Sequence, residues 1–222
     1  MSVTRRLFVG GAFAIGAGAL SGCAGGGARQ SKLAGPLNAD GTVNLAELMK
    51  PGPLGEKELG KPNAPNTIIE YASLTCPFCY KFHLSTYQRI KKELIDTGKV
   101  RYIIREFPIG RSAGTAAIIT RCAPEKDYFV LFDKYLRQQR KWVSQDVLPD
   151  AIFKIASQTG MSRQAFDACL TNKKVEDGLA LVKQRGREFG ISGTPTFFVN
   201  GKKARGDLTF DQITAMMGAK VT

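Results

Sequence analysis

The residues best suited to chemistry in this sequence are two cysteines, Cys76 and Cys79, separated by Pro77 and Phe78. They lie between an apolar, β-rich segment, 67–73, and a segment whose apolar residues recur at helical spacing. A cysteine at the start of a helix faces unpaired backbone N–H groups and the positive end of the helix dipole, and both stabilise its thiolate. The placement therefore predicts that the pKa of Cys76 falls well below the ordinary value of ~8.5.

The two cysteines are expected to have different roles. Cys79 lies one helical turn further into the predicted helix, so we expect it to be more buried and able to form a disulfide with Cys76. Pro77 suits the first helical turn, where its missing N–H would have had no partner. We therefore assign Cys76 as the attacking nucleophile and Cys79 as the resolving thiol.

A structural zinc site and an inert disulfide are the alternatives for this cysteine pair. Zinc requires about four ligands, and only His83, the sole histidine, lies within local reach, with no second CxxC motif in the sequence. We therefore expect no metal and no cofactor beyond the redox-active disulfide of Cys76 and Cys79. We expect His83 to be a partly exposed helix residue rather than a catalytic group.

A second motif, Thr194-Pro195, comes just before a strand-like segment, 196–200. A proline at the first residue of a strand is tolerated only where no ladder hydrogen bond is required. In the cis form it would present the backbone of Thr194 beside the dithiol, leaving N–H and C=O groups free to pair with an extended substrate chain. An ordinary trans turn proline is the alternative that this motif alone leaves open.

The elements that position these motifs follow a mixed α/β order. We expect strands at 67–73, 99–107, 196–200 and 202–205, and helices at 77–96, 112–122, 125–140, 146–159, 162–170, 173–189 and 210–217. Ser144 and Ser162 are predicted N-caps, and Thr209 with Gln212 forms a predicted capping box. The sequence thus predicts an α/β fold in which a long helical block interrupts a small sheet.

Segments 70–82 and 194–197 resemble the active-site segment and the cis-proline loop of the DsbA family in the thioredoxin superfamily. The resemblance covers roughly residues 64–219. It implies a thioredoxin-like fold with an inserted all-helical subdomain, and disulfide exchange with reduced or misoxidised exported polypeptides through a mixed disulfide at Cys76. It also implies a membrane redox partner.

The same resemblance implies roles for five residues. Glu70 would be a buried carboxylate that relays the proton of the buried thiol, although an edge-facing strand residue is the alternative. Thr194, Pro195, Pro77 and Phe78 would bind the substrate. Strongly oxidising family members carry Pro-His where this chain carries Pro-Phe, so a weaker oxidant is expected.

The direction of electron flow stays open at this point. Disulfide formation is the main hypothesis, and a periplasmic reductase, an isomerase or a non-catalytic binding lipoprotein are the alternatives. Cys122 and Cys169 both fall in the helical block, and we hypothesise that they form a structural disulfide rather than remaining two free buried thiols.

The N-terminus has the features of an export signal. Arg5 and Arg6 precede an apolar stretch too short for a stable membrane span, which ends in a segment, 20–23, that resembles a bacterial lipobox. We therefore expect a twin-arginine-like signal at 1–22 and lipidation of Cys23, with an ordinary secretory signal and a chance cysteine as alternatives. The expected location is periplasmic in the bacterial cell envelope, with a lipid anchor holding the chain to a membrane.

Composition sets the remaining expectations. The chain has 222 residues, a hydrophobic fraction of 43% and a formal net charge of +13, which suits one domain with a sizeable core. Its basic residues are scattered rather than gathered on one motif, so we expect a basic surface near an anionic membrane and no nucleic-acid partner. We expect a tether and N-terminal arm at 23–63, a DsbA-like domain at 64–222 with its insertion at about 111–175, and a monomer.

Overall fold

The structure is a computed structural model that describes residues 36–38 and 42–218. The predicted export signal and Cys23 lie outside the described residues. Within the described residues, no helix is long and apolar enough to cross a membrane.

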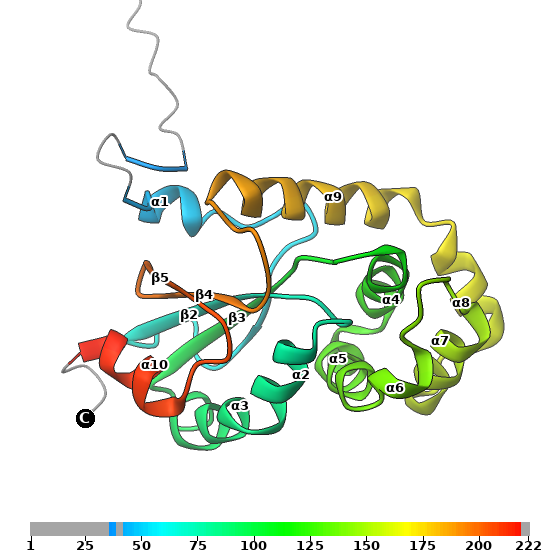
Figure 1. Cartoon of the computed structure of the whole chain (residues 1–222), viewed down its shortest axis with the longest axis horizontal. Coiled ribbons are helices and arrows are strands. Elements are labelled where there is room, and N and C mark those ends of the chain that lie inside the picture. The colour runs from blue at the N-terminus through cyan, green and yellow to red at the C-terminus, as the bar shows by residue number, and fades with distance from the viewer. Residues whose placement is uncertain (1–35, 39–41, 219–222) are drawn as a thin grey trace, which may run out of the picture. The chain divides into compact units, whose positions relative to one another are not determined.

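Five strands form one mixed sheet in the order β1-β3-β2-β4-β5 (Figure 1). β2 and β3 are parallel, and the other neighbouring pairs are antiparallel. The strands are β1 (Lys57–Leu59), β2 (Asn66–Ala72), β3 (Val100–Glu106), β4 (Thr196–Val199) and β5 (Lys202–Arg205).

Helices precede, connect and follow these strands. Those outside the long β3–β4 connection are α1 (Leu45–Leu48), α2 (Pro77–Leu84), α3 (Thr86–Ile90) with a π-helical turn at Lys91–Ile95, and α10 (Phe210–Met217). The connection from β3 to β4 contains α4 (Arg111–Cys122), α5 (Tyr128–Arg137), α6 (Gln139–Trp142), α7 (Pro149–Ala156), α8 (Arg163–Leu170) and α9 (Lys173–Glu188), with 3-10 turns at Glu125–Asp127 and Ser157–Thr159. An all-helical block therefore separates the two motifs of the predicted site.

Several local predictions are confirmed by the structure. α10 begins with the capping box of Thr209 and Gln212. The hydroxyl of Ser162 caps α8 by accepting from the backbone N–H of Ala165 at 3.1 Å. Gly160 ends the 3-10 turn with a left-handed φ of 85°, a conformation that glycine adopts without steric cost.

Three other predictions are wrong. The helix expected at 77–96 is broken at Ser85, whose φ and ψ of −119° and −87° are not helical. Ser144 does not cap a helix, because α7 begins only at Pro149, after Leu148. No strand was expected before residue 67, yet Lys57–Leu59 forms β1, which pairs with β3.

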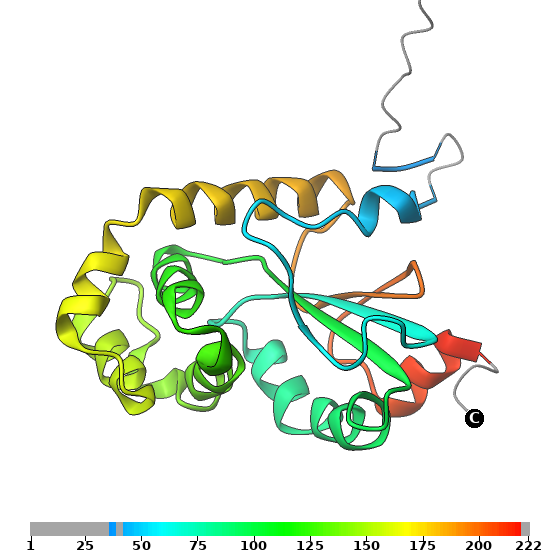
Figure 2. The ribbon, with the colours of Figure 1, turned by 180° about the vertical axis from the view of Figure 1, so that it is seen from behind.

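Alternation of side chains along β2 separates two cores on opposite faces of the sheet. Ile68 and Ala72 belong to a large core, whereas Ile69 and Tyr71 belong to a smaller one. Helices α2, α3 and α10 cover the first face, and α1 and α9 cover the second (Figures 1 and 2). Glu70 is two residues from both Ile68 and Ala72, so its side chain points to the same face of the sheet as theirs. That face is the one covered by α2.

A buried ion pair ties the helical block to the sheet. Arg121 of α4 donates from Nε to Glu106 Oε1 at 2.5 Å and from its terminal nitrogen to Oε2 at 2.7 Å. Both side chains are at most 3% exposed, and the Tyr128 hydroxyl also donates to Glu106 at 2.7 Å. Removing one member would leave an unpaired charge away from water.

We predict that Glu106→Ala lowers the free energy of unfolding by about 3–5 kcal/mol, because Arg121 would stay buried without its counter-ion. The measurement is urea unfolding of the oxidised protein. Lys50→Ala is the matched control, since it removes an exposed ion pair with Glu47 and should cost at most about 1 kcal/mol. Equal losses in the two variants would contradict the prediction.

Candidate active site

Cys76 lies at the junction of sheet and helix, as the sequence predicted. It is the N-cap residue of α2, with an extended backbone, and Pro77 is the first residue of the helix. The turn after β2 is closed by a hydrogen bond from the Cys76 N–H to the Ser73 carbonyl oxygen at 3.1 Å. The helical block also supports this turn, because Gln139 Nε2 donates to the carbonyl oxygens of Leu74 and Cys76 at 2.8 and 3.0 Å.

The peptide bond between Thr194 and Pro195 is cis, as predicted for this motif. In its thiol form, Cys76 Sγ donates to the Thr194 carbonyl oxygen at 3.2 Å. Thr196, at the start of β4, helps hold the loop by donating from Oγ1 to the Gly193 carbonyl oxygen at 2.6 Å. The structure therefore brings the two predicted motifs together at one place.

The thiolate of Cys76 is stabilised at this junction. The pKa of Cys76 is lowered to about 6, and the largest cause is a hydrogen bond from the Cys79 thiol. Burial opposes the shift, while Thr194 and the backbone N–H groups of Cys79 and Phe78 add to it. Among the residues that the structure describes, the Thr194 hydroxyl makes no hydrogen bond.

The direction of this pKa shift confirms the prediction for Cys76, but its main cause was not foreseen. Sequence reasoning named the backbone N–H groups and the helix dipole, whereas the Cys79 thiol contributes most. Cys79 is fully buried, and its pKa is raised well above the ordinary value, first by burial and then by its bond to Cys76 and the charge of Glu70. The pair is therefore strongly asymmetric, with one ionisable thiol at the helix start and one held protonated beneath it.

Glu70 lies in the core on the same side of the sheet as this pair. It is fully buried; its Oε2 shares a hydrogen bond with His83 Nε2 at 2.8 Å and accepts one from the Tyr102 hydroxyl at 2.5 Å. Its other oxygen, Oε1, receives no hydrogen bond from the described residues. The carboxylate is thus buried near the dithiol, as the resemblance implied, and is not an edge-facing strand residue.

The expectation that His83 is partly exposed was wrong, and Tyr102 was not identified from the sequence. His83 is only 2% exposed and bonds directly to Glu70. Its position four residues after Cys79 was a usable signal, because residues at that spacing share one helix face. Tyr102 reaches the carboxylate from β3, which pairs with β2 in parallel register, and the sequence alone did not reveal that register.

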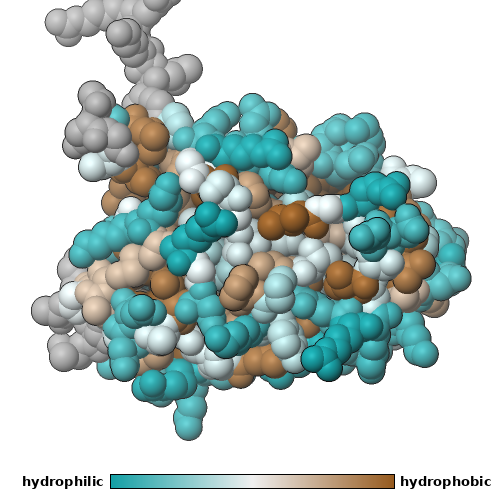
Figure 3. Space-filling view, viewed as in Figure 1, coloured by the Kyte–Doolittle hydropathy of each residue, from teal (hydrophilic) through white to brown (hydrophobic). Residues whose placement is uncertain are grey.

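The surface beside Cys76 carries exposed apolar side chains. Phe78 is 57% exposed and Ile109 is 48% exposed. The Thr75 hydroxyl donates to the Ile109 carbonyl oxygen at 3.0 Å, which holds this second apolar residue close to the cysteine turn. In the view of Figure 3, separate apolar patches interrupt a largely hydrophilic surface. Such a surface offers contacts to an extended polypeptide that places a cysteine over Cys76.

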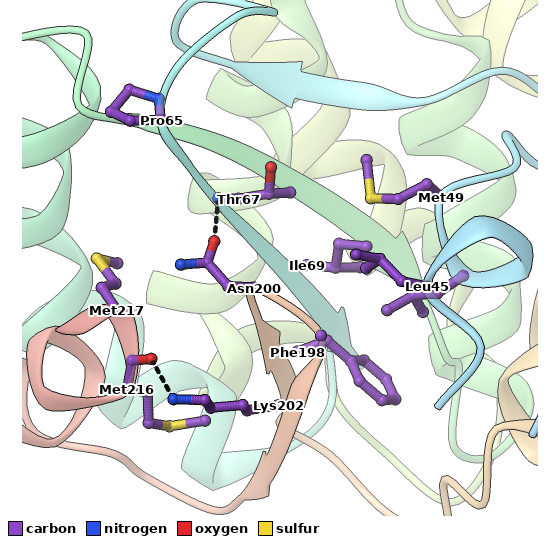
Figure 4. A pocket seen from close by; sticks show the side chains of 12 residues that line it. Leu45, Met49, Pro65, Thr67, Ile69, Phe198, Asn200, Lys202, Met216 and Met217 are labelled. Carbon is purple, nitrogen blue, oxygen red and sulfur yellow. Dashed lines mark hydrogen bonds between the residues drawn. The ribbon is translucent and has the colours of Figure 1, made fainter. Parts of the chain in front are cut away.

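A different pocket, of about 490 Å³, lies between α1, the sheet and α10 (Figure 4). Its lining includes Thr67 near the start of β2, whereas Cys76 follows the end of that strand. Among the described residues, no cysteine or carboxylate lines it, and the one cation there, Lys202, donates to the Met216 carbonyl oxygen at 3.3 Å. This pocket is therefore separate from the redox chemistry.

Among the described residues, no cluster of three or more His, Cys, Asp or Glu residues could hold a metal ion.

Cys122 and Cys169 face each other where α4 packs against α8. Both are free thiols in this structure. Burial raises the pKa of Cys169 to about 12, with a smaller contribution from a hydrogen bond with the Cys122 thiol. The structure thus brings the two sulfurs together without joining them, and the structural disulfide stays a prediction.

Comparisons with known proteins agree with this geometry. The sequence model of the Thioredoxin family matches residues 55–219. The chain belongs to the thioredoxin family. The matched stretch begins ahead of β1, which agrees with the place of that strand in the sheet.

The relatives of this thioredoxin-family chain include DsbA proteins. Its structure is similar to the crystal structure of Wolbachia pipientis α-DsbA1, with 31% identity, a TM-score of 0.72, and coverage of 79% of this chain and 94% of that one. A Rickettsia typhi protein named as a protein-disulfide oxidoreductase is 33% identical over 145 residues, covering 64% of this chain and 54% of the relative. The chain therefore spans about half the length of that curated relative.

A third similarity is to disulfide bond formation protein D of Bacillus subtilis. It is 24% identical over 172 residues, covering 74% of this chain and 76% of that protein. The recognition of a DsbA-type member of the thioredoxin superfamily, made from segments 70–82 and 194–197, is confirmed by these comparisons.

We predict that the thiolate absorbance of the reduced protein rises with a midpoint near pH 6, and that Cys76→Ser abolishes this transition. Because the folded-state pKa lies below that of an unfolded thiol, the ionised Cys76 stabilises the folded reduced protein at neutral and higher pH. That contribution is lost as the pH falls through about 6. A midpoint near 8.5, the ordinary value for cysteine, would contradict the site geometry.

We predict that air-oxidised protein contains a disulfide between Cys122 and Cys169. Closing a loop of about 47 residues should add roughly 4 kcal/mol to the free energy of unfolding. The measurement is mass spectrometry of non-reduced peptides, with chemical unfolding of Cys122→Ala alongside. Alkylation of both thiols in fully oxidised protein would rule the disulfide out.

Proposed function

We propose that this chain is an enzyme, a thiol–disulfide oxidoreductase that forms disulfides in exported polypeptides through a mixed disulfide at Cys76. The observation that carries the proposal is the contact between the sulfur of Cys76 and the cis-proline loop at Thr194, at 3.2 Å. It places an ionisable thiol where an extended chain can pair with the backbone. The names of the relatives support the same class of activity.

The exchange can be written with its electrons balanced. A substrate thiolate attacks the sulfur of Cys76 in the oxidised protein, and the bond between Cys76 and Cys79 breaks. Cys79 leaves as a thiolate and takes up a proton. A second substrate thiolate then attacks the substrate sulfur of the mixed disulfide and releases Cys76 as a thiolate. The substrate loses two electrons and gains a disulfide, while the protein's own disulfide becomes two thiols.

The asymmetry of the pair favours oxidation of substrates over their reduction. A thiolate that is stable at neutral pH makes the reduced protein more stable, and this raises the reduction potential of the disulfide. The pKa of about 6 at Cys76 therefore supports an oxidant. Phe78 cannot donate a side-chain hydrogen bond to the thiolate, which supports a milder oxidant than a Pro-His pair would give.

Four further features belong to the proposal. The substrates are reduced or misoxidised exported polypeptides that lie across Thr194, Pro195, Pro77 and Phe78. A membrane redox partner reoxidises the pair. Lipidation of Cys23 holds the chain to a membrane on the periplasmic side of the cell envelope. The chain acts as a monomer.

We predict that the purified oxidised protein restores activity to reduced, unfolded ribonuclease at a rate at least about tenfold above that of a Cys76→Ser variant. It should reduce insulin only weakly, because its reduced form is the stable one. Cys79→Ala should accumulate mixed disulfides with the substrate, since no thiol remains to resolve them. Strong insulin reduction without ribonuclease refolding would show a reductase instead, and activity in neither assay would show a binding protein.

A further inference from the structure

His83 is a buried titratable side chain that takes no direct part in the exchange of thiols and disulfides. Its ring lies between aromatic groups, with centroids 4.5 Å from Tyr87 and 5.4 Å from Phe132. Its Nε2 is held by Glu70 at 2.8 Å. An imidazole can accept a proton on one nitrogen while releasing one from the other, so the surroundings of its second nitrogen matter.

The second nitrogen, Nδ1, makes no hydrogen bond to a described residue. Among the described residues, only two buried side-chain oxygen or nitrogen atoms lack a partner, Glu70 Oε1 and Thr194 Oγ1. Neither atom belongs to His83, which is 2% exposed. A pocket of about 270 Å³ lies against His83 and provides the opening.

This pocket, called here the His83 pocket, reaches the protein surface. Its rim includes Val130, which is 49% exposed, and the ion pair of Arg137 with Asp133, whose side chains are 43% and 35% exposed. None of the residues around Cys76 lines it. His83 thus bonds to a buried carboxylate through one nitrogen and also lines a pocket that Cys76 does not line.

The exchange reaction needs such a connection. Cys79 has no exposed surface, yet it must gain a proton when it leaves the disulfide and lose one when the disulfide closes again. Glu70 is close enough for its charge to act on this thiol, and Glu70 Oε1 is free to take up a hydrogen. Glu70 itself is fully buried, so it must exchange its proton with another group.

We propose that His83 connects Glu70 to solvent through the His83 pocket and thereby supplies and removes the proton of Cys79. The proposal rests on the proposed disulfide exchange. His83 touches neither sulfur nor substrate, so it acts through Glu70 and is a positioning residue for the proton rather than a catalytic residue.

The proton balance follows one path in both directions. When the disulfide closes, Cys79 gives its proton to Glu70 as its sulfur attacks that of Cys76 and the thiolate of the other partner departs. Glu70 passes a proton to Nε2 of His83, which at this stage carries its single hydrogen on Nδ1, and Nδ1 releases that hydrogen to water in the pocket. When the disulfide opens, a proton enters at Nδ1, leaves Nε2 for Glu70 and moves from there to Cys79.

The two tyrosines beside this proton path stay uncharged. Tyr102 donates to Glu70 from β3, and its pKa is raised well above the ordinary value by burial and by that carboxylate. Tyr87, from α3, has its pKa raised by burial. The tyrosines therefore stay protonated, and the charges that line the pocket are Lys91 and the paired Asp133 and Arg137.

The test uses the reduced full-length chain mixed rapidly with glutathione disulfide. This single reaction resolves two steps, the second-order attack by Cys76 and the first-order closure by Cys79 that releases glutathione. In His83→Gln, the amide can still donate to Glu70 but cannot exchange protons. Closure should slow at least about tenfold, less than the roughly 100- to 10,000-fold of a direct general acid–base group because Glu70 stays in place, while attack by Cys76 stays within about twofold.

Chemical rescue separates proton transfer from packing. In His83→Ala, added imidazole should accelerate closure in a saturable way, because the vacated space adjoins the pocket. Tyr87→Phe is the matched control, since it changes a residue of the same pocket that does not bond to Glu70, and closure should be unchanged. A closure rate in His83→Gln within about twofold of the native protein, or His83→Ala closure that imidazole does not accelerate, would overturn the proposal.

A measurement on the native protein covers the case in which both His83 variants fail to fold. Closure should be about twofold or more slower in D₂O, whereas attack by the pre-ionised Cys76 should not change. Absence of an isotope effect on closure would overturn the proposal. Loss of the attack step itself in the native protein would instead count against the proposed function, so the two failures are distinguishable.

Discussion

The meeting of the Cys76 sulfur with the backbone of Thr194 is the interaction on which the rest of the structure depends. It requires β2 to end so that α2 begins at Cys76, and it requires β4 to pair with β2 so that the cis-proline loop arrives opposite. Because neither segment can shift along the sheet without moving its side chains to the other face, the register of β2 and β4 fixes the site. The helical block also stabilises the turn at Cys76, through hydrogen bonds from Gln139.

A second constraint is the burial of Cys79 under that contact. Full burial keeps this thiol protonated, and its hydrogen bond is the largest contribution to the ionisation of Cys76. The same burial creates a need for a proton path, because the sulfur cannot meet water directly. Glu70, on the matching face of β2, and His83, on the matching face of α2, fill that need. The burial of Cys79 therefore explains both the ionisation of Cys76 and the need for a proton path.

The parts of the site that sequence could predict are those set by local chemistry. The helix start at Cys76 followed from the change of periodicity and from Pro77, and the loop at Pro195 from a proline ahead of a strand. The other parts of the fold and the site depend on pairing between strands that are far apart in the sequence. β1 was missed because its three residues gain regular structure only by pairing with β3, and Tyr102 was missed because its contact with Glu70 depends on strand register.

The position of the His83 pocket has one consequence for how the chain would work when occupied. A polypeptide bound across Phe78 and Pro195 covers the sulfur of Cys76 but leaves the His83 pocket open. Electrons and hydrogen ions then cross the protein boundary at different places. A large client can cover Cys76 completely while Cys79 still takes up its proton as the mixed disulfide forms.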